Sequence, residues 1–167
     1  MFVASDNDIN VHGINWFVEE VLPDLRAKHP AAEVWLVGTV ANKIGEQAGV
    51  KRLGRVDDLS EVYGKAHLVI NPVRFNTGLS IKNLEALAFS CPLVTAPVGT
   101  EGLEQGINVA YLVADKPNEF VDAIGQILTD DSTATRLSVA ARNLAESWNE
   151  TALEQLNRAL EGQGKAQ

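Results

Sequence analysis

The stretch that decides the fold is residues 71–97, NPVRFNTGLSIKNLEALAFSCPLVTAP. An apolar strand at residues 68–70 runs into its Pro/Asn/Thr/Gly loop, which is followed by a helical pattern and a second apolar strand. Gly78 lets the backbone approach a ligand closely, and the free amides at the start of the helix favour an anion. Lys82 and Glu85 are three residues apart on that helix, on neighbouring parts of one face. The stretch therefore predicts a phosphate-binding mouth flanked by a cation and a hydroxyl-accepting carboxylate.

Short apolar strands alternate with helical patterns on both sides of this stretch. We expect strands at residues 2–5, 33–37, 50–53, 67–70, 92–95 and 109–113, and a polar turn at 6–10. We expect helices at residues 13–28, 42–48 and 57–63, near Leu103, at 120–128, and in two separate pieces around 137–144 and 153–160. The alternation predicts an α/β fold: a Rossmann-like parallel sheet with helices on both faces, followed by C-terminal helices. Ligands of such sheets bind beyond the carboxyl ends of the strands.

Composition limits the classes of partner. A chain of 167 residues with 46% hydrophobic residues suits a single domain, residues 1–162, with a disordered tail at 163–167. The net charge of -8, without a Lys/Arg cluster, argues against nucleic acid or an anionic membrane as partner. No apolar run approaches the ~20 residues of a membrane span, and no leader precedes the first strand, so we expect a cytoplasmic protein. Cys91 is alone, which excludes an internal disulfide and a cysteine zinc cluster.

Three further segments join the opening stretch in resembling a known family. They are Gly102 within PVGTEGL (97–103), GRVDDL (54–59), and Val11-His12-Gly13 before Trp16-Phe17. Together these residues resemble the C-terminal, nucleotide-sugar-binding domain of GT-B glycosyltransferases of the group 1 (family 4) type. The resemblance covers nearly the whole chain. It implies a retaining transfer of a sugar from a nucleotide diphosphate donor, with no cofactor and no metal.

The same resemblance implies that half of the enzyme is missing. Members of this family use two Rossmann-like domains that face each other across a cleft, and this chain has one of them. A strand that follows Met1 at once also suggests an excised domain. We therefore expect the isolated chain to be inactive without an N-terminal acceptor domain, because transfer needs donor and acceptor held together.

The resemblance assigns roles to matching positions. Glu85 is expected to accept hydrogen bonds from the ribose hydroxyls, and the amides of Gly78, Leu79 and Ser80 to meet the diphosphate. Lys82 is the expected catalytic residue, because a positive charge there would stabilise the leaving nucleotide as its oxygen becomes more negative. The backbone at Arg55 and Val56 is expected to read the base, with Gly38 at the mouth of a neighbouring strand.

The chain also departs from the family pattern. Many members carry two glutamates eight positions apart, and counting back from Glu85 gives Thr77, which leaves recognition of the donor sugar open. Many members also place a cation near the first strand-to-helix turn, where residues 5–10 here offer acids. Arg74 is a candidate for a second positive charge on the diphosphate, although an Arg after a strand is more often a solvated surface residue.

Alternative interpretations remain at this point. Gly78, Lys82 and Glu85 also fit a solvated helix start with a weak charge pair. A sugar-nucleotide epimerase of the same architecture would use a similar pocket, and Thr77 keeps a non-catalytic nucleotide-binding or interaction module under consideration. At the C-terminus, an apolar stripe of Leu153, Leu156 and Leu160 would lack its cover without the missing domain. We expect that stripe either to fold onto its own domain or to pair with another copy as a homodimer.

Overall fold

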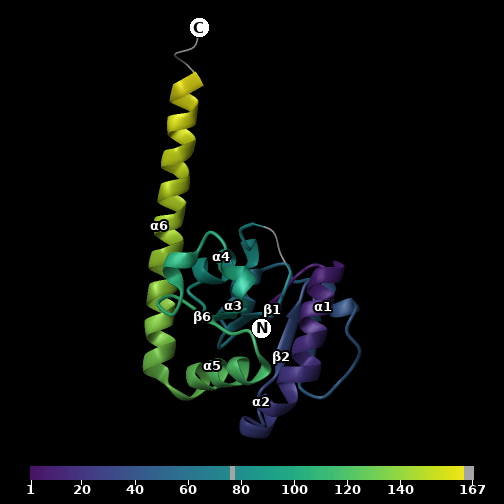
Figure 1. Ribbon diagram of the computed structural model, residues 1–167. Coiled ribbons are helices and arrows are strands. Elements are labelled where there is room, and N and C mark those ends of the chain that lie inside the picture. Colours follow the sequence, from purple (N-terminus) through teal and green to yellow (C-terminus); the bar gives the residue numbers. More distant parts are fainter. Residues whose placement is uncertain (76–77, 164–167) are drawn as a thin grey trace.

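The computed structural model describes residues 1–75 and 78–163, and its strands lie between two layers of helices (Figure 1). All strand pairs are parallel and form two three-stranded sheets, β1-β2-β3 and β4-β5-β6. The amide of Ile70 in β4 donates to the carbonyl of Met1, next to β1, at 2.9 Å and joins the two sheets. The strands are β1 Phe2–Val3, β2 Val34–Val37, β3 Val50–Gly54, β4 Val69–Asn71, β5 Leu93–Thr95 and β6 Leu112–Val113.

The resulting order, β3-β2-β1-β4-β5-β6, is that of a doubly wound Rossmann sheet, so the expected fold class is confirmed. The chain changes direction across the sheet between β1 and β4. In such sheets ligands bind outside the carboxyl ends of the strands at this switch point. The loop and helix of the opening stretch follow β4, so the fold places them there.

The side chains of alternate strand residues belong to two hydrophobic clusters, one on each face of the sheet. Leu36 and Ile70 belong to the first cluster, and their neighbours Val37 and Val69 to the second. The first cluster is covered by α1 Asp8–Trp16, the π-helical turn η1 Phe17–Val21, α2 Leu22–Lys28 and α5 Pro117–Thr129. The second is covered by α3 Leu59–Tyr63, α4 Ile81–Ala88 and α6 Asp131–Gln163. Both faces of the sheet are therefore buried, as parallel sheets require.

The first helix begins earlier than expected, at Asp8, so the prediction of a polar turn through residue 10 is wrong. Asn7 is the N-cap, and its side chain accepts a hydrogen bond from the amide of Asn10 at 2.8 Å. Asn is among the strongest N-cap residues, and Asp8 in the first turn is favoured by the helix dipole. The early start makes Asn10 part of α1 and brings its side chain to Lys82 of α4.

The helix expected at residues 42–48 is absent, and that prediction is wrong. The 3₁₀ turn η2 ends at Asn42 after starting at Thr39, and no helix follows before β3. Gly45 and Gly49 disfavour a helix here, and Ile44 is the one buried apolar side chain of residues 43–48 in this part of the structure. The helix expected near Leu103 is the short 3₁₀ turn η4 Glu104–Gly106, which follows η3 Pro97–Thr100.

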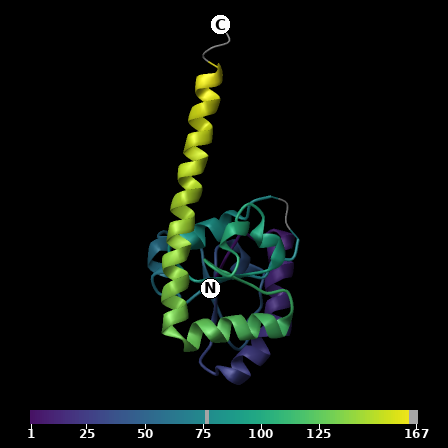
Figure 2. The same ribbon diagram turned by 60° about the vertical axis from the view of Figure 1, so that its left-hand side comes forward.

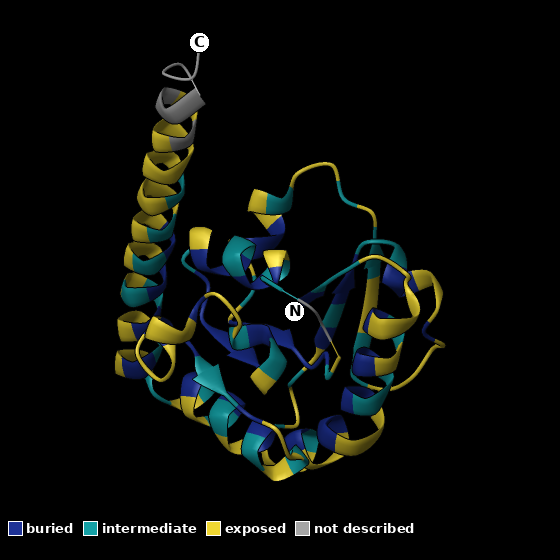
Figure 3. Cartoon of the chain, turned by 45° about the horizontal axis from the view of Figure 1, so that its top comes forward, coloured by how far each residue is buried: buried dark blue, intermediate teal, exposed yellow. Residues whose placement is uncertain are grey.

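The two helices expected near the C-terminus are one helix, α6, of 33 residues. Neither Gly nor Pro lies between Leu144 and Leu153, so nothing in the sequence ends the helix there. Figures 1 and 2 show its last turns projecting beyond the body, and Figure 3 shows mostly exposed positions on that part. Leu153, Leu156 and Leu160 are 52%, 55% and 60% exposed, so the stripe does not fold back onto its own domain.

The tail was expected to begin at residue 163, but Gln163 is still helical, and residues 164–167 lie outside the described part. Even with α6 included, no helix among residues 1–75 and 78–163 is long and apolar enough to cross a membrane.

Candidate functional site

Lys82 and Asn10 meet at the switch point, Asn10 from the helix that follows β1 and Lys82 from the helix that follows β4. Lys82 Nζ lies 2.6 Å from Asn10 Oδ1 and 5.5 Å from the centre of the Phe2 ring. Burial lowers the pKa of Lys82 to about 8, so the ammonium is still mostly protonated at neutral pH. The first strand-to-helix turn, which has no cation of its own, thus receives one from α4.

A close approach of α1 to the loop after β4 allows this contact. A Cβ added to Gly13 would lie 2.9 Å from Val73 Cα and 3.1 Å from the carbonyl oxygen of Pro72. Any larger residue at position 13 would force the helix and the loop apart. Gly13 therefore keeps the α1 side of the site within reach of Lys82.

A buried polar network under the start of α4 fixes this helix to the carboxyl ends of β4 and β5. Asn71 Nδ2 donates to Asn83 Oδ1 at 2.8 Å and to Ser80 Oγ at 3.2 Å. Asn83 Nδ2 donates to Thr95 Oγ1 at 2.9 Å and to the carbonyl of Gly99 at 2.8 Å. A Cβ at Gly99 would clash with the Thr95 and Asn83 side chains, so only glycine fits. The network holds the helix start in one position relative to the strands.

The residues before α4 are those predicted to bind an anion, and that role stays a prediction. Gly78 has a φ of 80°, a left-handed conformation that glycine adopts at little cost. Its amide donates to Glu101 Oε2 at 2.9 Å, so a carboxylate already occupies this donor. Leu79 is half-buried against the second cluster, and Ser80, the N-cap residue, makes no side-chain cap hydrogen bond. A phosphate oxygen at the Gly78 amide would have to replace Glu101.

Glu85, one turn along α4 from Lys82, is half-buried and meets α3. Tyr63 Oη donates to Glu85 Oε2 at 3.3 Å. The Tyr63 ring stacks on Phe89, with centroids 4.3 Å apart and planes inclined by 10°. Burial, and then the nearby Glu85 carboxylate, raise the pKa of the Tyr63 hydroxyl, which therefore stays a donor. The contact holds one oxygen of Glu85 and fixes the carboxylate on the α3 side of the helix.

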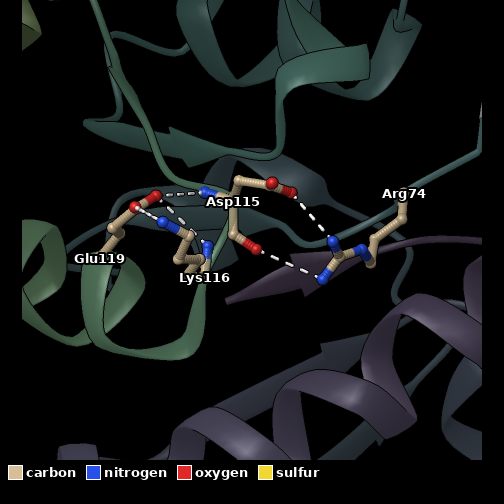
Figure 4. A network of polar contacts seen from close by, with 4 residues as sticks. All are labelled: Arg74, Asp115, Lys116 and Glu119. Atoms are coloured by element: carbon tan, nitrogen blue, oxygen red, sulfur yellow. Dashed lines mark hydrogen bonds and ion pairs between the residues drawn. The ribbon is translucent and has the colours of Figure 1, made fainter.

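The Arg74 side chain pairs with Asp115 and lies over the Trp16 ring. Its Nη2 lies 3.0 Å from Asp115 Oδ1, its Nη1 donates to the Asp115 carbonyl at 3.3 Å, and its guanidinium lies over Trp16 at 4.9 Å. Figure 4 shows this pair joined to the cap of α5, where Glu119 Oε2 accepts from the amides of Asp115 and Lys116. Arg74 links the loop after β4 to the start of α5. Its proposed contact with a diphosphate stays a prediction.

The remaining predicted residues follow the neighbouring strands. Gly38 follows β2 directly with a φ of 94°, its amide donates to the Gly54 carbonyl at 2.7 Å, and a Cβ would clash with the Ala4 carbonyl. Arg55 and Val56 come directly after β3. Both positions are at the carboxyl edge of the sheet, with Gly38 after the strand next to β1 and Arg55 and Val56 after the strand beyond it. Thr77 lies outside the described residues.

Two other features bear on the choice of site. A cavity of about 500 Å³ lies at the opposite, amino-terminal edge of the strands, lined by Met1, Val34 and Leu68 among others. Its walls are mainly apolar, and none of the predicted phosphate- or ribose-binding residues reaches it. Among residues 1–75 and 78–163, no three His, Cys, Asp or Glu side chains come together as metal ligands would. The polar groups suited to a charged ligand gather instead at the carboxyl edge.

Solved structures share this fold at low sequence identity. HepE of Anabaena, in complex with UDP, is 18% identical with a TM-score of 0.67, over 94% of this chain and 48% of that one. WaaG, a glycosyltransferase involved in lipopolysaccharide biosynthesis, is 20% identical with a TM-score of 0.64, over 87% and 42%. The C-terminal domain of LpcC, a group 1 family protein from Francisella tularensis, is 14% identical with a TM-score of 0.68, over 87% and 83%.

A relative found by sequence is also much longer than the matched segment. An uncharacterized 44.6 kDa protein of the cps region of Klebsiella pneumoniae is 24% identical over an alignment of 106 residues, and the match covers 56% of this chain and 27% of that protein. The chain thus spans half or less of HepE, WaaG and this relative, but most of the isolated LpcC domain. The family model described as "Glycosyl transferases group 1" matches residues 1–130. The resemblance seen in the sequence is confirmed, and the chain belongs to the group 1 glycosyltransferases of the GT-B fold.

Proposed function

We propose that this chain is the donor-binding half of a retaining glycosyltransferase and binds the nucleotide diphosphate of a sugar donor at the carboxyl edge of β1 and β4. One observation carries the proposal. The Lys82 ammonium, the start of α4 and the Gly78 amide lie around the switch point, with Glu85 one turn away on the same helix. Each group suits a different part of a nucleotide diphosphate.

The phosphates are assigned to the start of α4. The amides at a helix start attract an anion, and the polar network beneath α4 keeps them in place without reorganisation. Lys82, protonated at neutral pH, adds a full charge. When the bond between sugar and diphosphate breaks, negative charge grows on the departing phosphate oxygen, and Lys82 stabilises that charge more than it stabilises the bound donor.

The ribose is assigned to Glu85 and the base to the adjoining strand ends. The Tyr63 hydroxyl holds one carboxylate oxygen of Glu85, and the carboxylate has further acceptor sites for ribose hydroxyls. Gly38, Arg55 and Val56 extend the same edge beyond β1 and are assigned to the base. HepE, which shares this fold, was solved in complex with UDP, and this supports a nucleotide as the ligand of this chain.

Transfer itself is assigned to the longer protein. The chain covers 48% of HepE and 42% of WaaG, so we place the acceptor site on a second, N-terminal domain, without which this chain is inactive. The nucleotide sugar is a substrate in this proposal, and neither a cofactor nor a metal takes part. The cytoplasmic location expected from the sequence is part of the same proposal.

Calorimetric titration of the chain with UDP, GDP and ADP tests the proposal. We expect one of the three to bind, and Glu85→Ala to weaken that binding by about tenfold or more, since ribose hydroxyls bonded to a carboxylate contribute roughly 1.5–3 kcal/mol. Glu61→Ala is the matched control, because Glu61 is exposed on α3 and pairs with Lys65 just beyond the end of the helix. The proposal is wrong if none of the three nucleotides binds, or if Glu85→Ala and Glu61→Ala bind alike.

A further inference from the structure

Asn10 is a buried polar residue that the family resemblance did not single out, and it touches the residue proposed to bind the diphosphate. It is 5% exposed and lies in the first turn of α1. Its Oδ1 accepts from Lys82 Nζ at 2.6 Å, while its Nδ2 donates to the Ser5 carbonyl at 3.1 Å and to Ser5 Oγ at 3.3 Å. Its backbone amide is held by the Asn7 cap at 2.8 Å. Both ends of the Asn10 amide and its backbone are therefore fixed.

A neutral amide at this position has a specific electrostatic consequence. A carboxylate 2.6 Å from an ammonium would form an ion pair and cancel much of the charge available to a bound anion. The carbonyl oxygen of an amide fixes the ammonium by one hydrogen bond and leaves its net charge in place. Asn10 therefore orients Lys82 without neutralising it.

The acids of the segments around the site have other partners or are exposed. Asp6 Oδ1 accepts from Thr39 Oγ1 at 3.0 Å, Glu85 accepts from Tyr63, and Glu101 accepts from the Gly78 amide. Asp8 is exposed in the first turn of α1. In the part of the chain that the structure describes, no carboxylate oxygen lies within the 4.0 Å of an ion pair from Lys82 Nζ. In line with this, burial alone lowers the Lys82 pKa, without a charged partner to raise it.

We infer that Asn10 is a positioning residue: it holds the Lys82 ammonium, with its charge intact, at the mouth between β1 and β4 where the diphosphate binds. The inference rests on the function proposed above and deepens it. It also explains how a first turn rich in acids coexists with anion binding, since the cation comes from α4 and the turn supplies its neutral anchor.

Two substitutions of Asn10 and one control test the inference. Asn10→Asp keeps the shape of the side chain and adds a charge, and Asn10→Ala removes the anchor. Asn7→Ala is the control, because it loosens the start of α1 through the same cap but leaves the Asn10 side chain on Lys82. The probes are UDP and uridine, which differ in the diphosphate.

At pH 7, we expect Asn10→Ala to bind UDP roughly three- to tenfold more weakly than the wild type, and Asn10→Asp at least as weakly. We expect uridine binding to stay unchanged in both, and Asn7→Ala to lose clearly less UDP affinity than Asn10→Ala. Equal losses of UDP affinity in all three variants, or equal losses for uridine and UDP, would overturn the inference, since Asn10 would then act through the fold of α1.

Titration of the Lys82 side chain by NMR, with ¹³C-labelled lysine and Lys82→Arg for assignment, needs no ligand. The wild-type signal should titrate near pH 8, and in Asn10→Asp the midpoint should rise by ~1 unit or more, because an opposite charge favours the ammonium. An unchanged midpoint contradicts the inference even if no nucleotide binds. If the midpoint rises as expected but UDP, GDP and ADP all fail to bind, the proposed function fails while the Asn10–Lys82 contact stands.

Discussion

Replacing Asn83 by Ala should strongly destabilise the protein, because the Asn83 side chain is the centre of the polar network under α4. Asn83 is 0% exposed and lies on α4 between the two strands that flank it. It accepts from Asn71 and donates to Thr95 Oγ1 and to the Gly99 carbonyl. Asn83→Ala removes all three bonds at once and leaves two buried acceptors and one donor with fewer partners.

The magnitude follows from those three bonds. A buried group that loses its hydrogen bond costs about 1–3 kcal/mol. Asn71 keeps a bond to Ser80 Oγ, and the space left by the amide can admit water, so we take the low end, ~1 kcal/mol for each bond. We expect the free energy of unfolding to fall by about 3 kcal/mol.

Urea unfolding followed by circular dichroism measures this change, provided the slope of the transition is unchanged. Asn143→Ala is the matched control, since Asn143 is exposed on α6 and should change stability by less than about 0.5 kcal/mol. A loss in Asn83→Ala within about 1 kcal/mol of the control would refute the account of the network. If the network holds the start of α4 in place, UDP affinity should fall as well.

Three further predictions concern separate parts of the chain. Glu101→Ala should bind UDP roughly two- to tenfold more tightly, because it frees the Gly78 amide of a hydrogen bond worth ~0.5–1.5 kcal/mol; Glu104→Ala, on the same loop, should not, and calorimetry on both decides. Folding lowers the Lys82 pKa from 10.5 to about 8, so the free energy of unfolding of the wild type should rise relative to that of Lys82→Met as pH increases through this window. Urea unfolding of both proteins at several pH values measures this difference. A difference that does not change with pH would argue against burial of the ammonium. Sedimentation should show self-association that is lost when the α6 leucines become Ser, and a wild-type monomer at all concentrations would rule out pairing through Leu153, Leu156 and Leu160.

The sheet was predictable because its signals are local. Each strand is a short apolar run, and the alternation with helices implies parallel pairing with ligands beyond the carboxyl ends of the strands. The predictions that were wrong also concerned local signals. The helix expected at residues 42–48 was predicted without an apolar face to bury, and the start of α1 was missed because Asn7 was assigned to a turn although it is a strong N-cap.

The residues of the candidate site were also predictable only in part. Gly78, Lys82 and Glu85 lie within one loop and helix, so spacing alone could group them. Asn10 and Tyr63 reach the site from segments 72 and 22 residues away from their partners, and no periodicity in one sequence links such positions. The same limit applies to Glu101. Its carboxylate belongs to a loop after the next strand and meets Gly78 only in the folded chain.

The C-terminal region shows a third kind of limit. The apolar stripe Leu153, Leu156, Leu160 was visible in the sequence, but whether it would be covered depends on long-range packing. The structure leaves it exposed on a helix that projects from the body (Figure 2). A surface of this kind fits a chain that spans about half of its structural relatives.

The position of the nucleotide is the central claim, and amide chemical shifts of the ¹⁵N-labelled chain titrated with UDP test it most directly. We predict the largest changes at Gly78–Ser80, Lys82 and Glu85, with smaller ones at Gly38 and Arg55–Val56. Changes confined to the amino-terminal edge of the strands, around Val34 and Leu68, would contradict it, as would a spectrum that UDP leaves unaltered.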